Sequence, residues 1–207
     1  MLHIIKHPLI ETKLNLMRNE ETNNRDFKAI LDEIASLCTY EIFKDLEVKV
    51  VGKIKTPTGC EVDRIKLVKN VIIVPILRAG IGMSDGVMSM LPTARVGHIG
   101  LYRNEETLEP VDYYCKMPKV DNPLVLLCDP MLATGGSGSA AISLLKKNGF
   151  KEIRLLCLVG VQQGVDKILK EHPDVEIYLC SLDERLNEKG YILPGLGDAG
   201  DRIFGTI

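Results

Sequence analysis

The chain has 207 residues, of which 45% are hydrophobic, and its formal net charge is -2. That length suits one compact α/β domain with a sizeable core and is short for two ordinary domains, so we expect a single domain over residues 1–207. The near-neutral charge argues against a protein that binds nucleic acid or a membrane surface over a large area. We therefore expect a small-molecule partner.

The cysteines and the hydrophobic pattern indicate the cellular compartment. Six cysteines lie far apart and show no C-x-x-C spacing, which is typical of reduced, buried thiols in a cytoplasmic protein. No segment approaches about 18 uninterrupted apolar residues, and the N-terminus lacks a long apolar stretch. We expect neither export nor membrane insertion.

The first third of the chain predicts helices and a hairpin. Residues 24–43 repeat apolar side chains at the spacing of an amphipathic helix, and we assign an N-terminal helical segment to about residues 1–45. Residues 46–51 and 61–66 then alternate around a turn signal at 56–59. This alternation predicts a half-exposed, peripheral antiparallel hairpin.

Short and nearly continuous apolar runs begin at Val71. They cover residues 71–76, 124–128, 153–159 and 175–180. Helix-like stretches lie between them, at residues 83–90, 137–147 and 162–171. Such runs suit strands buried on both faces, and the alternation predicts βαβ units of a parallel sheet flanked by helices. The Gly- and Pro-rich tail at 187–202 predicts an ordered, irregular loop that serves as a lid.

Residues 129–137, which read D-P-M-L-A-T-G-G-S, connect a buried strand to a helix. Ligands of an open parallel sheet collect at such strand ends, and a helix N-terminus favours an anion. Two glycines remove side-chain obstruction, while Thr134 and Ser137 add hydroxyl donors. A ligand-free helix cap is the alternative, but Asp129 directly after a buried strand favours a phosphate and sugar site. The lysine of a Walker loop is missing.

Two arginines follow strand-like stretches. Arg78 comes directly after a buried run, where an unpaired cation would be costly to place, and Arg103 lies in L-Y-R-N-E-E-T. Guanidinium groups suit pyrophosphate oxygens because they donate paired, charge-assisted hydrogen bonds. The alternative for each is a structural salt bridge, which for Arg103 could involve Glu105 or Glu106.

The chain resembles the uracil phosphoribosyltransferase family over nearly its whole length. The resemblance rests on P-I-L-R-A-G, L-Y-R-N-E-E-T, C-D-P-M-L-A-T-G-G-S and G-Y-I-L-P-G-L-G-D-A-G-D-R, in the family's order. It implies a phosphoribosyltransferase-like α/β fold with a peripheral β-hairpin and a C-terminal hood, about residues 182–207, over the active site. It also implies conversion of uracil and 5-phospho-α-D-ribose 1-diphosphate (PRPP) to UMP and diphosphate in UMP salvage. Type I relatives usually show two adjacent acids where this chain has Asp129 and Pro130, a departure typical of the uracil branch.

The resemblance implies roles for individual residues. Arg78, Arg103 and Asp198 would act in catalysis, and all three would contact PRPP. The other PRPP contacts would be Asp129, Pro130, Met131, Leu132, Ala133, Thr134, Gly135, Gly136 and Ser137. The uracil contacts would be Ile192, Gly197, Asp198 and Ala199.

The resemblance also implies Mg²⁺ as cofactor, carried by PRPP without direct protein ligands and reached through water from Asp129 or Asp198. The resemblance further implies that GTP is an effector and that the protein forms a homo-oligomer, a dimer or larger. We expect no membrane partner and no nucleic-acid partner. The four histidines look structural, and no H-E-x-x-H motif occurs.

Two alternatives remain open. A purine or orotate phosphoribosyltransferase would keep the chemistry and change the base, although the tail at 191–202 and the missing second acid speak against it. A PRPP-binding pyrimidine-regulatory protein that binds nucleic acid would need a basic face, which the whole-chain composition does not indicate.

Overall fold

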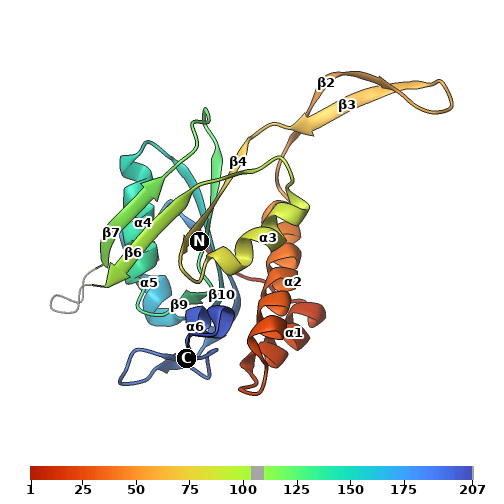
Figure 1. The fold of residues 1–207 in the computed structure, drawn as a ribbon. Helices are drawn as coiled ribbons and strands as arrows, with labels where there is room; N and C mark the ends of the chain where they lie inside the picture. Colours follow the sequence, from red (N-terminus) through yellow and green to blue (C-terminus); the bar gives the residue numbers. More distant parts are fainter. Residues whose placement is uncertain (104–109, 207) are drawn as a thin grey trace.

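The computed structural model describes residues 1–103 and 110–206, without the side chains of 102, 103 and 110–112. A central sheet has the strand order β1-β11-β10-β8-β4-β6-β7 (Figure 1). Its strands are β1 (Leu2–Ile4), β4 (Val71–Leu77), β6 (His98–Arg103), β7 (Pro110–Lys116), β8 (Leu124–Cys128), β10 (Glu152–Val161) and β11 (Glu176–Asp183). The short strands β5 (Arg95–Val96) and β9 (Met131–Leu132) pair with β4 and β10. Among the described strands of this sheet, all pairs are parallel except β6–β7.

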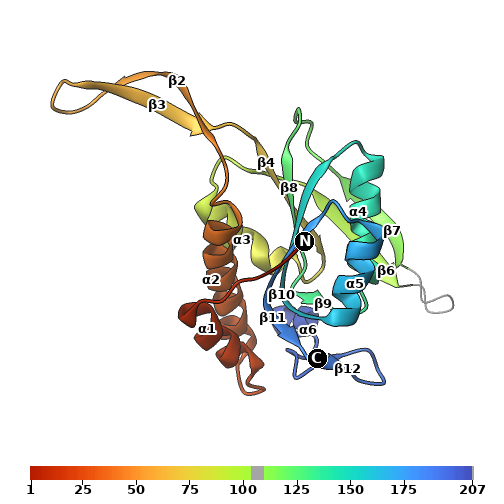
Figure 2. The same ribbon diagram turned by 180° about the vertical axis from the view of Figure 1, so that it is seen from behind.

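Helices cover both faces of this sheet, as Figures 1 and 2 show. The helices are α1 (Pro8–Arg18), α2 (Asn24–Ile42) and α3 (Ile81–Met90) on one face, and α4 (Gly136–Lys147) and α5 (Gln162–Glu171) on the other. Neighbouring residues of β4 pack to opposite sides: Ile73 joins the α1–α3 cluster, whereas Ile72 and Val74 join the α4–α5 cluster. Because both faces are covered, the central strands β4 and β8 are apolar throughout. The predicted parallel sheet flanked by helices is confirmed.

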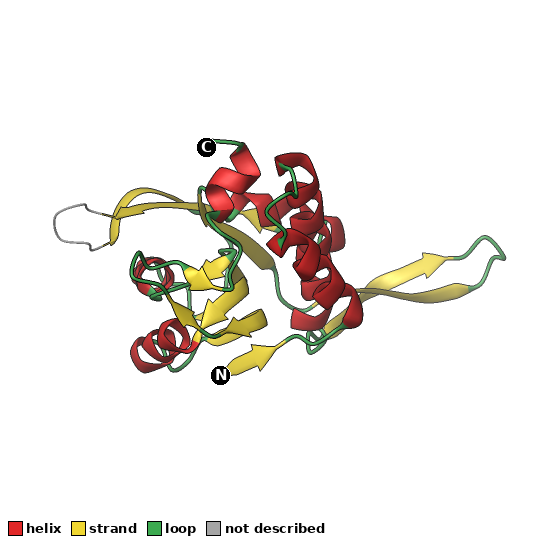
Figure 3. Cartoon of the chain, turned by 90° about the horizontal axis from the view of Figure 1, so that it is seen from below, coloured by secondary structure: helices red, strands yellow, loops and turns green. Residues whose placement is uncertain are grey.

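The hairpin forms where the sequence indicated, but its predicted half burial is wrong. Strands β2 (Val48–Lys55) and β3 (Glu61–Leu67) pair in antiparallel register, and every residue of both strands is exposed. The hairpin projects away from the rest of the molecule, so no other element of residues 1–103 and 110–206 covers either of its faces (Figures 1 and 3).

The C-terminal tail is more regular than predicted. Strands β12 (Arg185–Leu186) and β13 (Ile192–Leu193) form an antiparallel ribbon, and α6 (Ala199–Phe204) follows. Gly195 and Gly197 have φ angles of 63° and 72°, which glycine adopts without steric cost. The glycines therefore make turns between regular segments, and the apolar residues Leu196 and Ile203 are buried.

Three smaller findings complete the fold. The N-terminal segment contributes an edge strand, β1, which the helical expectation for residues 1–45 did not include. Burial of all six thiols was also wrong, because Cys60 and Cys115 are exposed. Among the described residues, no helix is both long and apolar enough to cross a membrane.

Candidate active site

Three segments distant in sequence meet beyond the carboxyl ends of the strands. A Cβ atom placed on Gly80, in the loop after β4, would lie 2.4 Å from the Cys128 carbonyl oxygen at the end of β8. A Cβ atom on Gly200 would lie 3.7 Å from Arg78 Nη2 and 3.2 Å from Asp198 Oδ1. The loop after β4 therefore contacts the start of the 129–137 segment on one side and the C-terminal segment on the other.

The 129–137 segment ends in an open helix terminus. Gly135 is the N-cap of α4 with a φ angle of 79° and has no side chain to cap the helix, while Thr134 Oγ1 accepts only a long hydrogen bond of 3.4 Å from the Gly136 N–H. A Cβ atom on Gly135 would lie 2.8 Å from the Gly164 carbonyl oxygen, so both the backbone angle and the space require glycine. The first N–H groups of a helix lack intrahelical acceptors and carry partial positive charge. This end of α4 can therefore bind an anion.

The first half of the segment is structural. Met131 and Leu132 form β9 and pair with β10. The Pro130 carbonyl accepts hydrogen bonds from the N–H groups of Leu158 and Val159, at 3.0 and 3.2 Å. Pro130 and Leu132 are buried, and proline has no N–H to donate. These residues hold the turn in place, so an anion would meet mainly the residues that follow them, Ala133, Thr134, Gly135, Gly136 and Ser137.

Asp129 lies between the core and this turn. Its side chain accepts a hydrogen bond from the Met131 N–H, yet burial raises the pKa of Asp129 to about 7. The residue as a whole is half-buried. Without a ligand, a good part of this carboxyl group is protonated near neutral pH. A metal ion or hydroxyl donors beside Asp129 would favour its ionised form.

Arg78 follows β4 and is mostly exposed. Its side chain has 59% of its surface exposed, and its Nη2 lies 3.4 Å from Asp201 Oδ1. The peptide bond between Leu77 and Arg78 is cis. A long contact at an exposed position contributes little, so the salt-bridge alternative does not account for a cation at this place. Arg103 is the last residue of β6, and its side chain lies outside the described part of the structure.

The predicted base-binding residues lie along the C-terminal segment. Asp198 caps α6, where its Oδ1 accepts a hydrogen bond of 2.9 Å from the Asp201 N–H. Ile192 and Ala199 are buried, whereas Gly197 and Asp198 are exposed. The structure thus brings Asp198 next to Arg78. Because the side chains of Ile192 and Ala199 are apolar, a ligand could form hydrogen bonds only with their backbone groups.

Sequence reasoning missed three residues that support this segment, namely Arg18, Asp183 and Arg202. Asp183 ends a buried strand just as Asp129 follows one, and that signal could have identified it. Arg202 closes the last motif quoted above. Arg18, in the last turn of α1, carries no sequence signal for this role because its partners are more than 160 residues away.

A cavity of about 650 Å³ lies elsewhere, between β1 and the residues that follow it, the C-terminal part of α2 and the start of β11. Its lining includes His3, Glu41, Lys44 and Glu176, and none of its residues belongs to the three segments above. The charges pair with one another, His3 with Glu176 at 3.3 Å and Lys44 with Glu41. We therefore place the candidate site at the carboxyl ends of the strands.

The family model of uracil phosphoribosyltransferases matches residues 4–206 of the chain. A curated uracil phosphoribosyltransferase from Mycoplasma mobile is 56% identical over 207 residues, which are 100% of both chains. A solved structure of a protein from Aquifex aeolicus is 36% identical, with a TM-score of 0.93, and the match covers 100% of this chain and 99% of that one. A hypoxanthine-guanine phosphoribosyltransferase from Bacillus anthracis, 8% identical with a TM-score of 0.52 over 77% and 80% of the two chains, shares the fold.

Proposed function

Since the chain belongs to the uracil phosphoribosyltransferase family, we propose that it converts uracil and PRPP to UMP and diphosphate. The observation that carries the proposal is the convergence at one sheet edge of an open helix N-terminus, a half-buried carboxyl group and an exposed arginine. These groups match the three parts of PRPP, namely its 5-phosphate, its ribose and its pyrophosphate.

The 5-phosphate would bind at the start of α4. Backbone N–H groups and the hydroxyls of Thr134 and Ser137 are donors, and a phosphate dianion accepts from several donors at once. The Asp129 carboxylate would accept hydrogen bonds from the ribose hydroxyls. Because the phosphate is remote from the reacting carbon, its binding energy positions C1 against the incoming base.

The pyrophosphate would bind to Arg78, with Arg103 as its second cation. Displacement at C1 builds negative charge on the leaving group, and guanidinium donors stabilise it in the transition state. The exposure of Arg78 and its long contact with Asp201 support this role, since little has to be broken when an anion arrives. The reaction needs no covalent nucleophile, because the base nitrogen forms the new bond as the diphosphate leaves.

Uracil would bind to backbone groups of Ile192, Gly197 and Ala199, beside Asp198. Its edge presents an acceptor, a donor and an acceptor, and cytosine would place a donor where uracil has an acceptor. Buried polar groups left unpaired by the wrong base discriminate strongly. Asp198 lies next to Arg78, which supports its contact with the ribose or with the proton that leaves the base.

The residues present also suit Mg²⁺ brought by PRPP. Among the described residues, no three histidine, cysteine or acidic side chains converge as a preformed metal site. Asp129 and Asp198 offer the oxygen ligands that Mg²⁺ prefers, and Mg²⁺ usually keeps several waters and binds substrate phosphates. The ion would neutralise charge on the pyrophosphate, and these carboxylates would bind it through its waters.

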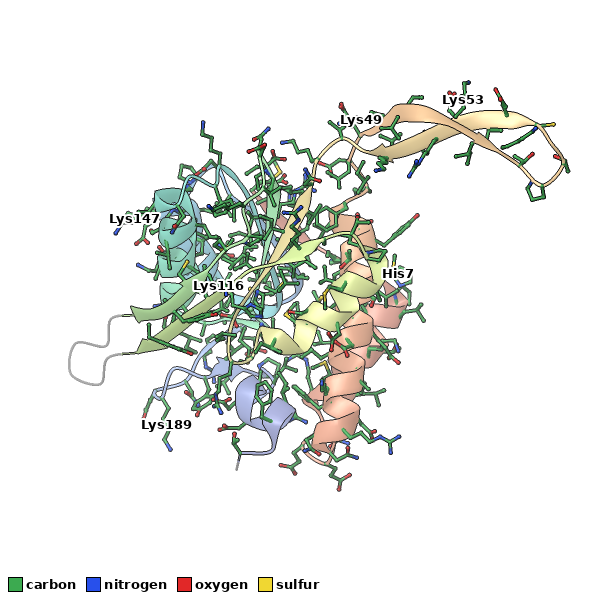
Figure 4. All side chains as sticks on the ribbon, turned by 45° about the horizontal axis from the view of Figure 1, so that its top comes forward. His7, Lys49, Lys53, Lys116, Lys147 and Lys189 are labelled. Atoms are coloured by element: carbon green, nitrogen blue, oxygen red, sulfur yellow. The ribbon has the colours of Figure 1, made fainter. Side chains whose placement is uncertain are left out.

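The exposed hairpin supports the homo-oligomer. Val48, Val50 and Ile65 are each 57–59% exposed, and Figure 4 shows Lys49 and Lys53 on the hairpin, away from the central sheet. An isolated two-stranded hairpin is marginally stable in water, and exposed apolar strands pair readily with another chain. We propose that the hairpin packs against a second copy of the chain.

We further propose that the protein is a cytoplasmic enzyme of UMP salvage. GTP would act as its effector.

The test incubates the protein with PRPP, Mg²⁺ and one of uracil, cytosine, hypoxanthine or orotate, with and without GTP, and separates the products by chromatography. UMP from uracil alone supports the proposal, and no UMP refutes it. Arg78→Ala should lower kcat/KM about a hundredfold or more, as loss of a transition-state charge partner does. Arg25→Ala, at an exposed position of α2, is the matched control and should change little.

A further inference from the structure

One residue of the C-terminal segment, Gly195, has both its backbone polar groups bound by a buried ion pair. Its N–H donates to Asp183 Oδ2 at 2.9 Å, and its carbonyl accepts from Arg18 Nη1 at 2.8 Å. Gly195 belongs to a tight turn, since a Cβ atom there would lie 2.1 Å from the Ile192 carbonyl oxygen. The position of this turn between Ile192 and Gly197 is therefore set by two side chains from other elements.

The ion pair itself is well formed. Arg18 donates to Asp183 Oδ2 at 2.8 Å and to Oδ1 at 2.7 Å, the two-pronged geometry of a strong pair. Ser181 Oγ also donates to Oδ1, at 2.6 Å. Only 2% of the Asp183 side chain and 22% of the Arg18 side chain are exposed. All four acceptor positions of the carboxylate are used, so it can hold one orientation.

A second arginine binds the next carbonyl along the chain. Arg202 Nη1 donates to Leu196 O at 3.0 Å, and its Nη2 donates to Asn19 O at 2.7 Å. Its guanidinium also lies 4.3 Å from the centre of the Phe27 ring. The consecutive carbonyls of residues 195 and 196 are thus both tied to the C-terminal end of α1 and the turn that follows it.

We propose that Arg18 and Asp183 are positioning residues for the base, holding the backbone of the 192–199 segment in the geometry that binds uracil. The inference rests on the proposed function, in which uracil meets backbone groups of this segment. Backbone N–H and C=O groups cannot rotate as side chains do. Their orientation therefore depends on the contacts that hold the backbone in place. Misplacement of about 1 Å in such a site costs up to a hundredfold. Among the described residues, the hydrogen bonds and ion pairs of Arg18 and Asp183 do not reach the 129–137 segment. The other PRPP contact in the C-terminal segment, Asp198, is held separately by its hydrogen bond with the Asp201 N–H, so PRPP binding should be spared.

The experiment compares Asp183→Asn and Arg18→Lys with wild type in steady-state assays that vary uracil and PRPP separately. We expect the KM for uracil to rise about tenfold or more while the KM for PRPP stays within about twofold. The matched control is Asp45→Asn, which weakens another two-pronged arginine pair, that of Arg154 and Asp45 at 2.8 and 2.6 Å. It should leave both values unchanged.

Either an unchanged KM for uracil or a parallel rise for both substrates in a folded variant would overturn the inference. If Asp183→Asn fails to fold, Arg18→Lys decides, because it keeps the charge and most of the side-chain volume while losing the paired donors. The two proposals fail differently. Wild type that makes no UMP refutes the proposed function, whereas active wild type with insensitive variants refutes only the positioning role.

Discussion

Replacing Asp129 with asparagine should make the ligand-free protein more stable at alkaline pH, although it removes a proposed substrate contact. Burial raises the pKa of Asp129 from its ordinary value of 3.8 to about 7 in the folded chain. Between these pH values the unfolded chain has released this proton while the folded chain still holds it. The stability associated with Asp129 is therefore fully present below pH 4 and is lost as the pH rises to about 7. An asparagine at this position would not titrate, so the variant escapes this loss.

The magnitude follows from the size of the shift. One pKa unit corresponds to about 1.4 kcal/mol, so the part of the shift that lies between pH 5 and pH 7 amounts to at most about 3 kcal/mol. Asp129 is half-buried, and partial contact with water reduces the effect, so we expect about 2 kcal/mol. The assay is urea unfolding of both proteins at pH 5, 6, 7 and 8. The free energy of unfolding of the variant, relative to wild type, should increase with pH and level off near pH 8.

Comparison of the two proteins at each pH cancels the other titrating groups. A difference in unfolding free energy that stays constant from pH 5 to pH 8 would refute the reasoning. A variant that loses stability relative to wild type as the pH rises would also refute it. Addition of PRPP and Mg²⁺ should reverse the order at pH 8, because the ligand stabilises only the protein that binds it well. The Asp129 carboxyl group would then lower the stability of the ligand-free protein and contribute to the binding of PRPP and Mg²⁺.

Three further predictions concern other parts of the chain. Gly135→Ala should raise the KM for PRPP at least tenfold and destabilise the fold by about 1–3 kcal/mol, because alanine at this position needs a positive φ and meets the Gly164 carbonyl oxygen. Steady-state kinetics measure the KM, and urea unfolding measures the stability. Arg202→Met should lower the free energy of unfolding by about 2 kcal/mol because buried carbonyls lose their donor, whereas Arg185→Met, at a side chain 70% exposed, should be nearly neutral. Val50→Asp should shift the sedimentation coefficient toward that of a monomer if the hairpin forms the contact between copies, and an unshifted value would contradict that contact.

The central sheet could be predicted from the sequence because strands buried on both faces leave a plain signal. The runs that became β4, β8 and β10 contain almost no polar residue, and their ends located Arg78 and Asp129 without any structure. Placing a charged side chain beside a buried strand costs free energy unless that side chain binds a ligand or pairs with another charge.

What the sequence could not predict depends on contacts between distant segments. The pairing of Arg18 with Asp183 joins residues 165 positions apart. Asp183 ends a buried strand, but no local pattern indicates that Arg18 is its partner. The exposure of the hairpin was missed for the same reason, since alternation shows that one face differs from the other but not whether anything covers it. The regular structure of the tail was hidden because its glycines make turns within an otherwise packed segment.

The close approach at Gly80 has a consequence for motion during turnover. The loop that carries Arg78 lies directly against the end of β8, where even a methyl group would overlap the Cys128 carbonyl. These two parts of the site are therefore fixed to one another and would move, if at all, as one body. The segment from Ile192 to Phe204 is held instead by side-chain hydrogen bonds and apolar contacts. Opening and closing around a substrate would fall to this segment, and hydrogen exchange there should respond to ligand while that of β4 and β8 should not.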